Sequence, residues 1–296
     1  MIGWLKKFRL WFYNFRLSLY HRKLRRGMDK VYNLLSDIAE NKELKDALVY
    51  YQQNPISVFP YNFIKDYENL DFQLNNEDGF PYLLWENKKI FFKQHWSDLH
   101  IIRYFKGVII EQDPDSPHRY LSEDFDVDKD TTVIDIGVAE GNFSLEVVDR
   151  AKRVLIFEND PGWVQALEKT FFSYSDRVEI HKKRVGELTS DSSLALDDMH
   201  ELFTEKIFVK IDVDGAERKV LAGMKDLLLK NQHIKVAICT YHNQGDASEF
   251  EAFFKDIGFQ TSFSKGYMLF YFQKEKMAPP FLRRGVLRAG KIYMTC

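Results

Sequence analysis

A glycine-rich turn occupies residues 135–143 (DIGVAEGNF), directly after an apolar run that is typical of a buried strand. Gly137 permits a turn that a side chain would obstruct, and Gly141 lets the start of the next helix approach a ligand closely. The G-x-x-x-G spacing differs by one residue from the G-x-G-x-x-G pattern that cradles a pyrophosphate. It favours a ligand without pyrophosphate, such as S-adenosylmethionine, whose ammonium group Asp135 could bind. The alternative is an ordinary strand-to-helix turn.

A carboxylate follows at the end of the next apolar run, RVLIFE, where Glu158 precedes Asn159. An acid about 20 residues after the glycine turn is suited to accept hydrogen bonds from ribose hydroxyls. An acid at a strand end is common on protein surfaces, but its spacing from the glycine turn favours the ligand role.

Three carboxylates cluster in residues 210–217 (KIDVDGAE), where a further strand gives way to a helix. Asp214 could cap this helix, and Glu217 could interact with its positive end. Capping does not explain Asp212, whose alternating position puts it at the strand tip, facing the cleft. Asp212 and Asp214 could instead hold a divalent metal ion, although the sequence does not require one.

The fifth apolar run ends in Tyr241 and His242. Histidine can act as a general base near neutral pH, and the alternative is a local hydrogen bond at the end of a buried strand. Upstream, His118 could line a substrate face together with His95, Trp96, Arg119 and Tyr120.

Apolar runs and helical patterns alternate from Thr132 onward, which predicts a doubly wound, mostly parallel sheet of the α/β class. The predicted strands cover 132–137, 153–158, 177–182, 206–213, 234–242, 260–264 and 267–273. The last two follow the final helix and predict an antiparallel pair at the sheet edge. In such sheets a ligand binds at the carboxyl ends of the strands.

Residues 115–273 resemble the FkbM-type methyltransferase family, within the class I S-adenosylmethionine-dependent fold. The resemblance depends on VIDIGVAEGNFSL (133–145), VLIFEND (154–160), SLALDD (193–198) and especially KIDVDGAERKVLAGM (210–224). It implies a seven-stranded Rossmann-like sheet with an antiparallel last strand, and O-methylation of a hydroxyl on a glycan or small molecule.

The resemblance also implies roles for individual residues. Asp135, Gly137 and Gly141 would meet the methionine part of the cofactor, and Glu158 would hold its ribose. Asp212 and His242 would face the acceptor. Asp214, Tyr241 and His118 are further candidates for the substrate side, from their positions in the sequence and not from the resemblance. The remaining expected neighbours of the cofactor are Asn142, Phe143, Asn159, Arg184, Val185 and Gly186, the last three near the adenine. The run C-T-Y-H departs from the family's E-x-H, so Tyr241 does not inherit the role of that glutamate.

The expected mechanism is in-line displacement, in which an acceptor oxygen attacks the sulfonium methyl group of the bound cofactor. Alignment of the two reactants and exclusion of water would supply much of the acceleration. We expect His242 to be the first candidate for the base and Asp212 the second. One rival function is a nicotinamide-dependent oxidoreductase, which the glycine spacing and KIDVDGAE disfavour. The other is a non-catalytic module that binds membrane surfaces.

The membrane hypothesis comes from the N-terminus. Residues 2–26 form a basic amphipathic pattern with Trp4, Phe8 and Trp11 on one face, which could lie at a membrane interface or pack on protein. The predicted organisation has four parts. They are an amphipathic helix (1–27), a helical and β-hairpin subdomain (28–125), the cofactor-binding domain (126–275) and a basic tail (276–296). The hairpin is expected around residues 86–89, and the helix that follows residue 28 is expected to end before Asn54-Pro55.

Charge and cysteine content narrow the function further. The chain has 42 Lys and Arg against 44 Asp and Glu, while its first 30 residues carry nine basic residues and one acid. The rest of the chain is therefore acidic, which argues against a nucleic-acid substrate. The two cysteines lack metal-ligand spacing and fit a reducing compartment. The sequence has no apolar run long enough to span a bilayer and no secretory signal pattern. These features predict a cytoplasmic protein, with the inner membrane face as an alternative.

Overall fold

The computed structural model of the protein describes residues 42–270 and 281–291, together with residues 18, 19, 21–23, 26 and 29. Most of the predicted amphipathic helix 2–26 lies outside the described residues, as does the start of the helix expected after residue 28. Within the part of the chain that is described, no helix is both long and apolar enough to cross a membrane.

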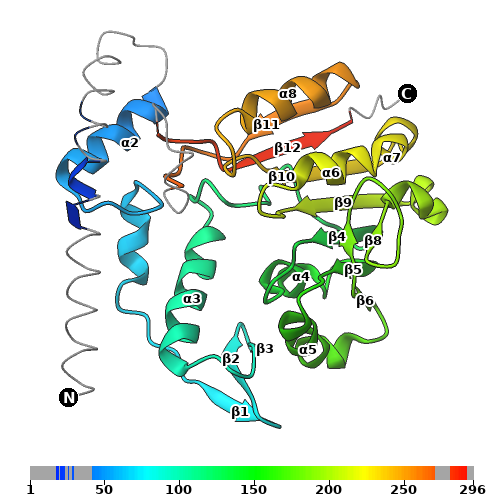
Figure 1. Ribbon diagram of the computed structural model, residues 1–296, viewed down its shortest axis with the longest axis horizontal. Coiled ribbons are helices and arrows are strands. Elements are labelled where there is room, and N and C mark those ends of the chain that lie inside the picture. Colours follow the sequence, from blue (N-terminus) through cyan, green and yellow to red (C-terminus); the bar gives the residue numbers. More distant parts are fainter. Residues whose placement is uncertain are drawn as a thin grey trace.

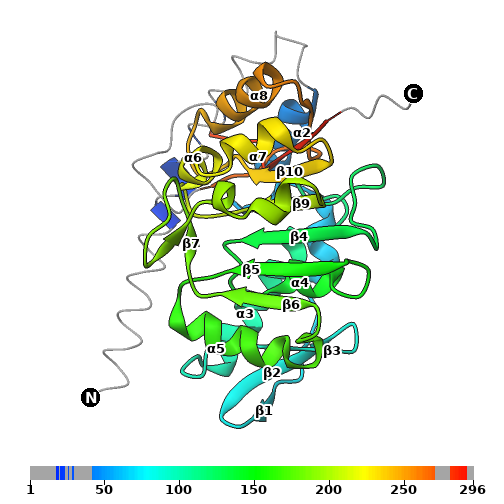
Figure 2. The same ribbon diagram turned by 90° about the vertical axis from the view of Figure 1, so that its right-hand side faces the viewer.

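A seven-stranded sheet forms the centre of the molecule, as Figures 1 and 2 show. Its strands are β4 (Thr131–Ile136), β5 (Arg153–Phe157), β6 (Val178–His181), β9 (Lys206–Ile211), β10 (Ile234–Cys239), β11 (Gln260–Phe263) and β12 (Val286–Gly290). Their order is β11-β12-β10-β9-β4-β5-β6. The pairs β4–β5, β4–β9, β5–β6 and β9–β10 are parallel, whereas β12 runs antiparallel to both β10 and β11. The predicted doubly wound α/β sheet with one antiparallel strand is confirmed.

The identity of that antiparallel strand differs from the prediction. It is Val286–Gly290, from the segment predicted to be a basic tail, and not residues 267–273, of which Met268 forms only an isolated bridge with Arg283. The predicted domain boundary at residue 275 is therefore wrong. The basic residues of this segment are typical of a solvated tail, but the Arg288 guanidinium donates hydrogen bonds to the backbone carbonyls of residues 119–121.

Helices cover both faces of the sheet (Figure 1). One face carries α3 (Asp98–Glu111), α4 (Asn142–Val147) and α5 (Pro161–Thr170), and the other carries α6 (Glu217–Ala222), α7 (Lys225–Lys230) and α8 (Asp246–Asp256). Successive strand residues point to opposite layers, so Val133 packs with the first group and Ile134 with the second. The same alternation puts Asp135 and Lys210 on the face of α3 and α4.

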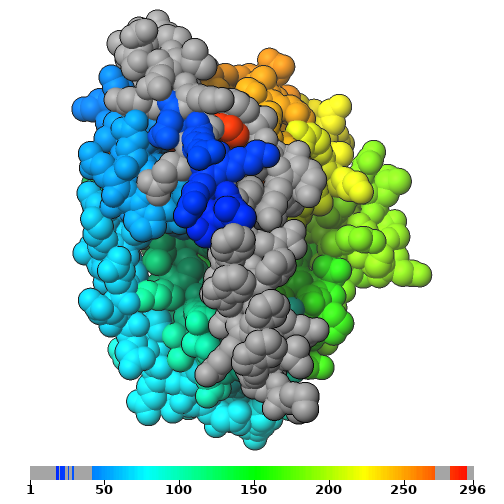
Figure 3. Space-filling view, turned by 60° about the vertical axis from the view of Figure 1, so that its left-hand side comes forward, coloured from blue at the N-terminus to red at the C-terminus, as the bar shows by residue number. Residues whose placement is uncertain are grey.

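The N-terminal part packs against the sheet domain and forms one side of the face shown in Figure 3, where residues 42–92 are blue to cyan. It contains α2 (Lys42–Gln53) and a small antiparallel sheet of β1 (Asn75–Glu77), β2 (Phe80–Trp85) and β3 (Lys88–Phe91). The predicted end of the first helix and the predicted hairpin are confirmed, with Glu86 and Asn87 at the turn in left-handed backbone conformations. The Thr170 hydroxyl of α5 accepts a hydrogen bond from the Phe91 N–H, so the hairpin shares the core of the sheet domain.

Shorter elements complete the described chain. The 3-10 helices are Asn62–Tyr67, Phe172–Tyr174, Leu196–Asp198 and His200–Phe203, and a separate two-stranded parallel sheet consists of β7 (Arg184–Val185) and β8 (Ser193–Leu194).

Candidate active site

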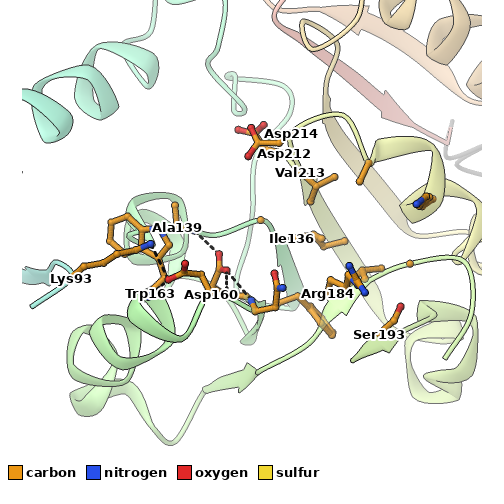
Figure 4. A pocket seen from close by; sticks show the side chains of 18 of the residues that line it. Lys93, Ile136, Ala139, Asp160, Trp163, Arg184, Ser193, Asp212, Val213 and Asp214 are labelled. Carbon is orange, nitrogen blue, oxygen red and sulfur yellow. Dashed lines mark hydrogen bonds and ion pairs between the residues drawn. The ribbon is translucent and has the colours of Figure 1, made fainter. Parts of the chain in front are cut away.

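A cavity of about 940 Å³ opens at the carboxyl ends of β4, β5 and β9 (Figure 4). This is the edge of a doubly wound sheet at which ligands bind. The predicted site residues that line it are Gly137, Glu158, Asn159, Arg184, Val185, Gly186, Asp212, Asp214 and Tyr241. Most of the residues predicted to bind the cofactor or face the substrate therefore line this cavity, whereas several others have structural roles elsewhere.

Gly137 holds the ends of two neighbouring strands together. Its φ is 76°, and a Cβ atom at this position would lie 1.8 Å from the backbone oxygen of Asp212. Its carbonyl accepts a hydrogen bond from the Lys210 ammonium group. The turn therefore needs glycine because of backbone packing between β4 and β9, in addition to any need for access to a ligand.

Asp135 does not line the cavity, which contradicts its predicted contact with the cofactor. Its carboxylate is buried, lies 3.1 Å from the Lys210 Nζ and accepts a hydrogen bond of 2.7 Å from the Ser144 hydroxyl. Burial alone would lower the pKa of Lys210, but the charges of Asp135 and Asp212 raise it. Asp135 thus forms a buried ion pair beneath the glycine turn.

Two further predicted cofactor neighbours are also structural. Gly141 has a φ of 86°, and a Cβ there would lie 2.7 Å from Leu167 and 2.9 Å from Phe171, so it permits close packing of α5 rather than of a ligand. Phe143 is buried and packs on Tyr120 with a ring-centroid distance of 5.3 Å. Asn142 lines a smaller neighbouring cavity instead of the large one.

Glu158 directly follows β5 and lies on the wall of the large cavity, and its contact with a ribose stays a prediction. Its carboxylate accepts hydrogen bonds from the backbone N–H groups of Ala139, Asn159 and Asp160, at 3.1, 2.8 and 2.8 Å. These contacts fix the orientation of the carboxylate and connect it to the glycine turn.

The side predicted for the adenine is formed by the small sheet β7–β8. Arg184 is exposed, Val185 is buried, and a Cβ at Gly186 would lie 2.7 Å from the Ser193 hydroxyl. Ser193 also lines the cavity but was not predicted; it is brought there by the pairing of β7 with β8. Figure 4 shows Arg184 and Ser193 together at this end.

An aromatic and cationic wall faces them across the cavity, and most of it was not predicted. Trp96 contacts Trp163 and Tyr104 at ring-centroid distances of 5.0 Å each. The Lys93 Nζ lies 2.8 Å from an oxygen of Asp160, the residue that caps α5, and 4.8 Å from the Trp163 ring centroid. The sequence suggests only Trp96 among these residues, because the wall is formed by docking of the N-terminal hairpin on α5, which no local spacing reveals.

Asp212 lies at the centre of a polar network. It accepts hydrogen bonds from the hydroxyl groups of Tyr120 and Tyr241, at 3.0 and 3.1 Å, and lies 3.5 Å from the His118 Nε2. Burial alone would raise the pKa of Asp212, but His118, Lys210 and His242 lower it well below its usual range. Asp212 is therefore an ionised carboxylate, and His118 is a buried partner of it that lines neither cavity.

His242 also lines neither cavity, and its side chain is only 1% exposed. Its Nδ1 lies 2.9 Å from a Glu217 oxygen, and its Nε2 lies 3.6 Å from oxygens of both Asp212 and Asp214. Burial alone would lower the pKa of His242, but the surrounding carboxylates raise it to about 10. This position does not support the predicted direct role of His242 as the base that contacts the acceptor.

A second cavity of about 350 Å³ adjoins the first and shares Tyr104, Gly137, Ala139 and Asp212 with it. It is lined by Glu140, whose carboxylate accepts a hydrogen bond of 2.5 Å from the Tyr104 hydroxyl. Burial raises the pKa of Glu140 to about 7, which suits an acid–base group. Glu140 lies within the predicted glycine turn, but its direction toward this cavity was not predictable from spacing.

Methyltransferases are among the solved structures that are similar to this chain, all at low sequence identity. Methyltransferase FkbM from Methylobacillus flagellatus is 18% identical with a TM-score of 0.46, over 67% of this chain and 56% of that one. The chain thus matches little more than half of that protein. Precorrin-6y C5,15-methyltransferase from Geobacter metallireducens is 14% identical with a TM-score of 0.37, over 56% and 83%. A Streptococcus mutans protein solved in complex with SAH is 14% identical with a TM-score of 0.35, over 56% and 91%.

Among curated protein sequences, none matches this chain. The family comparison is more direct. Residues 98–261, more than half of the chain, match the family described as Methyltransferase FkbM domain. The match begins at α3 and includes the glycine turn, Glu158 and the KIDVDGAE segment. The protein is therefore a member of the FkbM methyltransferase family.

Proposed function

We propose that the protein is an S-adenosylmethionine-dependent methyltransferase that methylates a hydroxyl group of a glycan or small molecule. The observation that carries this proposal is the pair of adjoining cavities at the carboxyl ends of β4 and β9, with Asp212 on the wall of both. The larger cavity suits the cofactor, and the smaller one suits the group that receives the methyl.

The larger cavity offers complementary groups at each end. Glu158 is oriented by backbone N–H groups to accept hydrogen bonds from ribose hydroxyls, and the β7–β8 sheet supplies the wall expected beside adenine. S-adenosylmethionine bound there would supply a methyl group on a sulfonium centre, a good leaving group for in-line displacement. The protein's part is to align the reactants and to exclude water.

In the smaller cavity, two carboxylates divide the work on the acceptor hydroxyl. Asp212 is ionised and accepts a hydrogen bond from the acceptor hydroxyl, which orients the hydroxyl oxygen toward the methyl group. Glu140, with a pKa of about 7, takes the proton as the oxygen–methyl bond forms. Glutamate at this position replaces His242 as the candidate base.

Calorimetry tests the cofactor: we expect binding of S-adenosylhomocysteine and no comparable binding of NAD. Incubation with labelled S-adenosylmethionine and cell-surface polysaccharide fractions tests the acceptor, with label expected in a polysaccharide. Binding of NAD instead of S-adenosylhomocysteine would overturn the proposal in favour of a nicotinamide-dependent oxidoreductase.

A further inference from the structure

His242 and the acidic residues around it form a cluster that the proposed methyl transfer does not use. Asp212, Glu217 and His242 bring potential ligand atoms within 4.8 Å of one another. Asp214 extends the cluster toward solvent, and Figure 4 shows its carboxylate beside that of Asp212 at one end of the large cavity. Three carboxylates therefore surround one imidazole.

The two nitrogens of His242 face different groups. Nδ1 lies 2.9 Å from the Oε1 of Glu217, which is fully buried and also accepts hydrogen bonds from the backbone N–H groups of Val213 and Gly215. A buried carboxylate beside Nδ1 keeps a proton there, so the proton that a bound cation would displace is the one on Nε2. This is the arrangement in which an outer carboxylate orients a histidine that binds a metal.

Nε2 points toward the gap between the other two carboxylates. It is buried, has no hydrogen-bond partner, and lies 3.6 Å from the Oδ1 of Asp212 and from the Oδ1 of Asp214. These separations are too long for hydrogen bonds. Bonds of roughly 2.0–2.2 Å from a shared cation to nitrogen and oxygen ligands put the ligand atoms roughly 3–4 Å apart, as found here.

Asp214 has a φ of 50°, a left-handed conformation that aspartate tolerates better than most residues. Asp214 is nevertheless fully exposed, so packing does not account for its orientation.

We propose that Asp212, Asp214 and His242 bind a divalent transition-metal cation, with Glu217 as the outer partner of His242. Imidazole with two carboxylates suits ions such as Mn²⁺ or Zn²⁺. If the proposed function holds, the ion lies beside the residue that both cavities share, where it would favour loss of the acceptor's proton.

Mn²⁺ titration of chelator-treated protein, followed by loss of the electron paramagnetic resonance signal of the free ion, tests the site. We expect one ion per chain, at least about ten-fold weaker binding in Asp214→Asn, and about 10–100-fold weaker binding in Glu217→Gln. Asn tolerates the same backbone conformation as Asp214, so the first variant keeps the fold. Glu187→Gln is the matched control, because Glu187 is exposed on the same cavity outside the cluster and its loss should leave Mn²⁺ affinity unchanged.

Failure of wild-type protein to take up Mn²⁺, or equal affinity in wild type, Asp214→Asn and Glu217→Gln, would overturn the site. The measurement uses neither cofactor nor acceptor, so its result is independent of the proposed function. An ion bound by a protein without affinity for S-adenosylhomocysteine would support the site and sink the proposed function.

Discussion

Lys210 and Asp135 are direct neighbours across the β4–β9 pair, and their charged groups lie 3.1 Å apart beneath the glycine turn. Both side chains are buried, and Lys210 also donates a hydrogen bond to the Gly137 carbonyl. The pair therefore connects the two strand ends to the turn that lines the cavity. The Lys210–Asp135 ion pair stabilises the fold because each charge neutralises the other, whereas either charge alone would be buried without a partner.

Lys210→Met should destabilise the protein by about 3–5 kcal/mol, because it leaves the Asp135 carboxylate buried and unpaired. Urea unfolding measures this loss. Adding Asp135→Asn to the same chain should recover part of it, since the unpaired charge is then removed. Lys230→Met is the control, because Lys230 forms an exposed pair with Asp226 and should cost less than about 1 kcal/mol. Equal effects of the two lysine substitutions would contradict the coupling.

Gly137→Ala should be strongly destabilising whether or not a cofactor binds. The added Cβ would lie 1.8 Å from the Asp212 backbone oxygen, at a φ of 76° that alanine rarely adopts. We expect a loss of at least about 3 kcal/mol or a failure to fold, from steric overlap combined with backbone strain. Gly245→Ala is the matched control, because a Cβ there would meet nothing within 4 Å. A stable Gly137→Ala protein without cofactor affinity would instead show that the glycine serves the ligand alone.

The sequence predicts which strand ends carry chemistry, but not which way their side chains point. Asp135 and Glu158 both end apolar runs, and both were expected to contact the cofactor. The register that pairs Asp135 with Lys210 involves strands about 75 residues apart in the chain, so no local pattern could reveal it. Glu158 remained on the cavity wall because it follows the last residue of β5 and is held by backbone groups of its own turn.

Long-range packing likewise explains the elements that the sequence missed. The alternation of strands and helices predicts the parallel core, since each element has its own apolar period. The sequence does not predict strand β12, because an arginine such as Arg288 is typical of a protein surface. In the folded protein its guanidinium binds the carbonyls of residues 119–121, which are distant in the sequence. Trp96 and Trp163 meet only because the N-terminal hairpin docks on α5.

Glu158→Gln should weaken binding of S-adenosylhomocysteine by roughly ten-fold to one hundred-fold, because hydrogen bonds from ribose hydroxyls to a charged acceptor are stronger than those to an amide. Isothermal titration calorimetry measures the dissociation constant. The glutamine oxygen can still accept hydrogen bonds from the Asn159 and Asp160 N–H groups, which both bind Oε1, but the contact of Oε2 with the Ala139 N–H is lost. Glu168→Gln, on the exposed side of α5, is the control. An unchanged affinity of Glu158→Gln for S-adenosylhomocysteine would show that Glu158 does not bind the ribose.

Glu140→Gln should become more stable relative to wild type as the pH rises. The pKa of Glu140 is raised by burial from 4.5 to about 7, so the unfolded chain releases its proton at lower pH than the folded protein does. Between these two values wild type therefore loses stability with rising pH, by about 3 kcal/mol in total, whereas glutamine has no proton to lose. Chemical unfolding at pH 4 and pH 8 measures this change in the difference between the two proteins. The exposed Glu123→Gln should show no such change. A difference between Glu140→Gln and wild type that stays constant over this range would mean that Glu140 is ionised at neutral pH and lacks the pKa that its role as base requires.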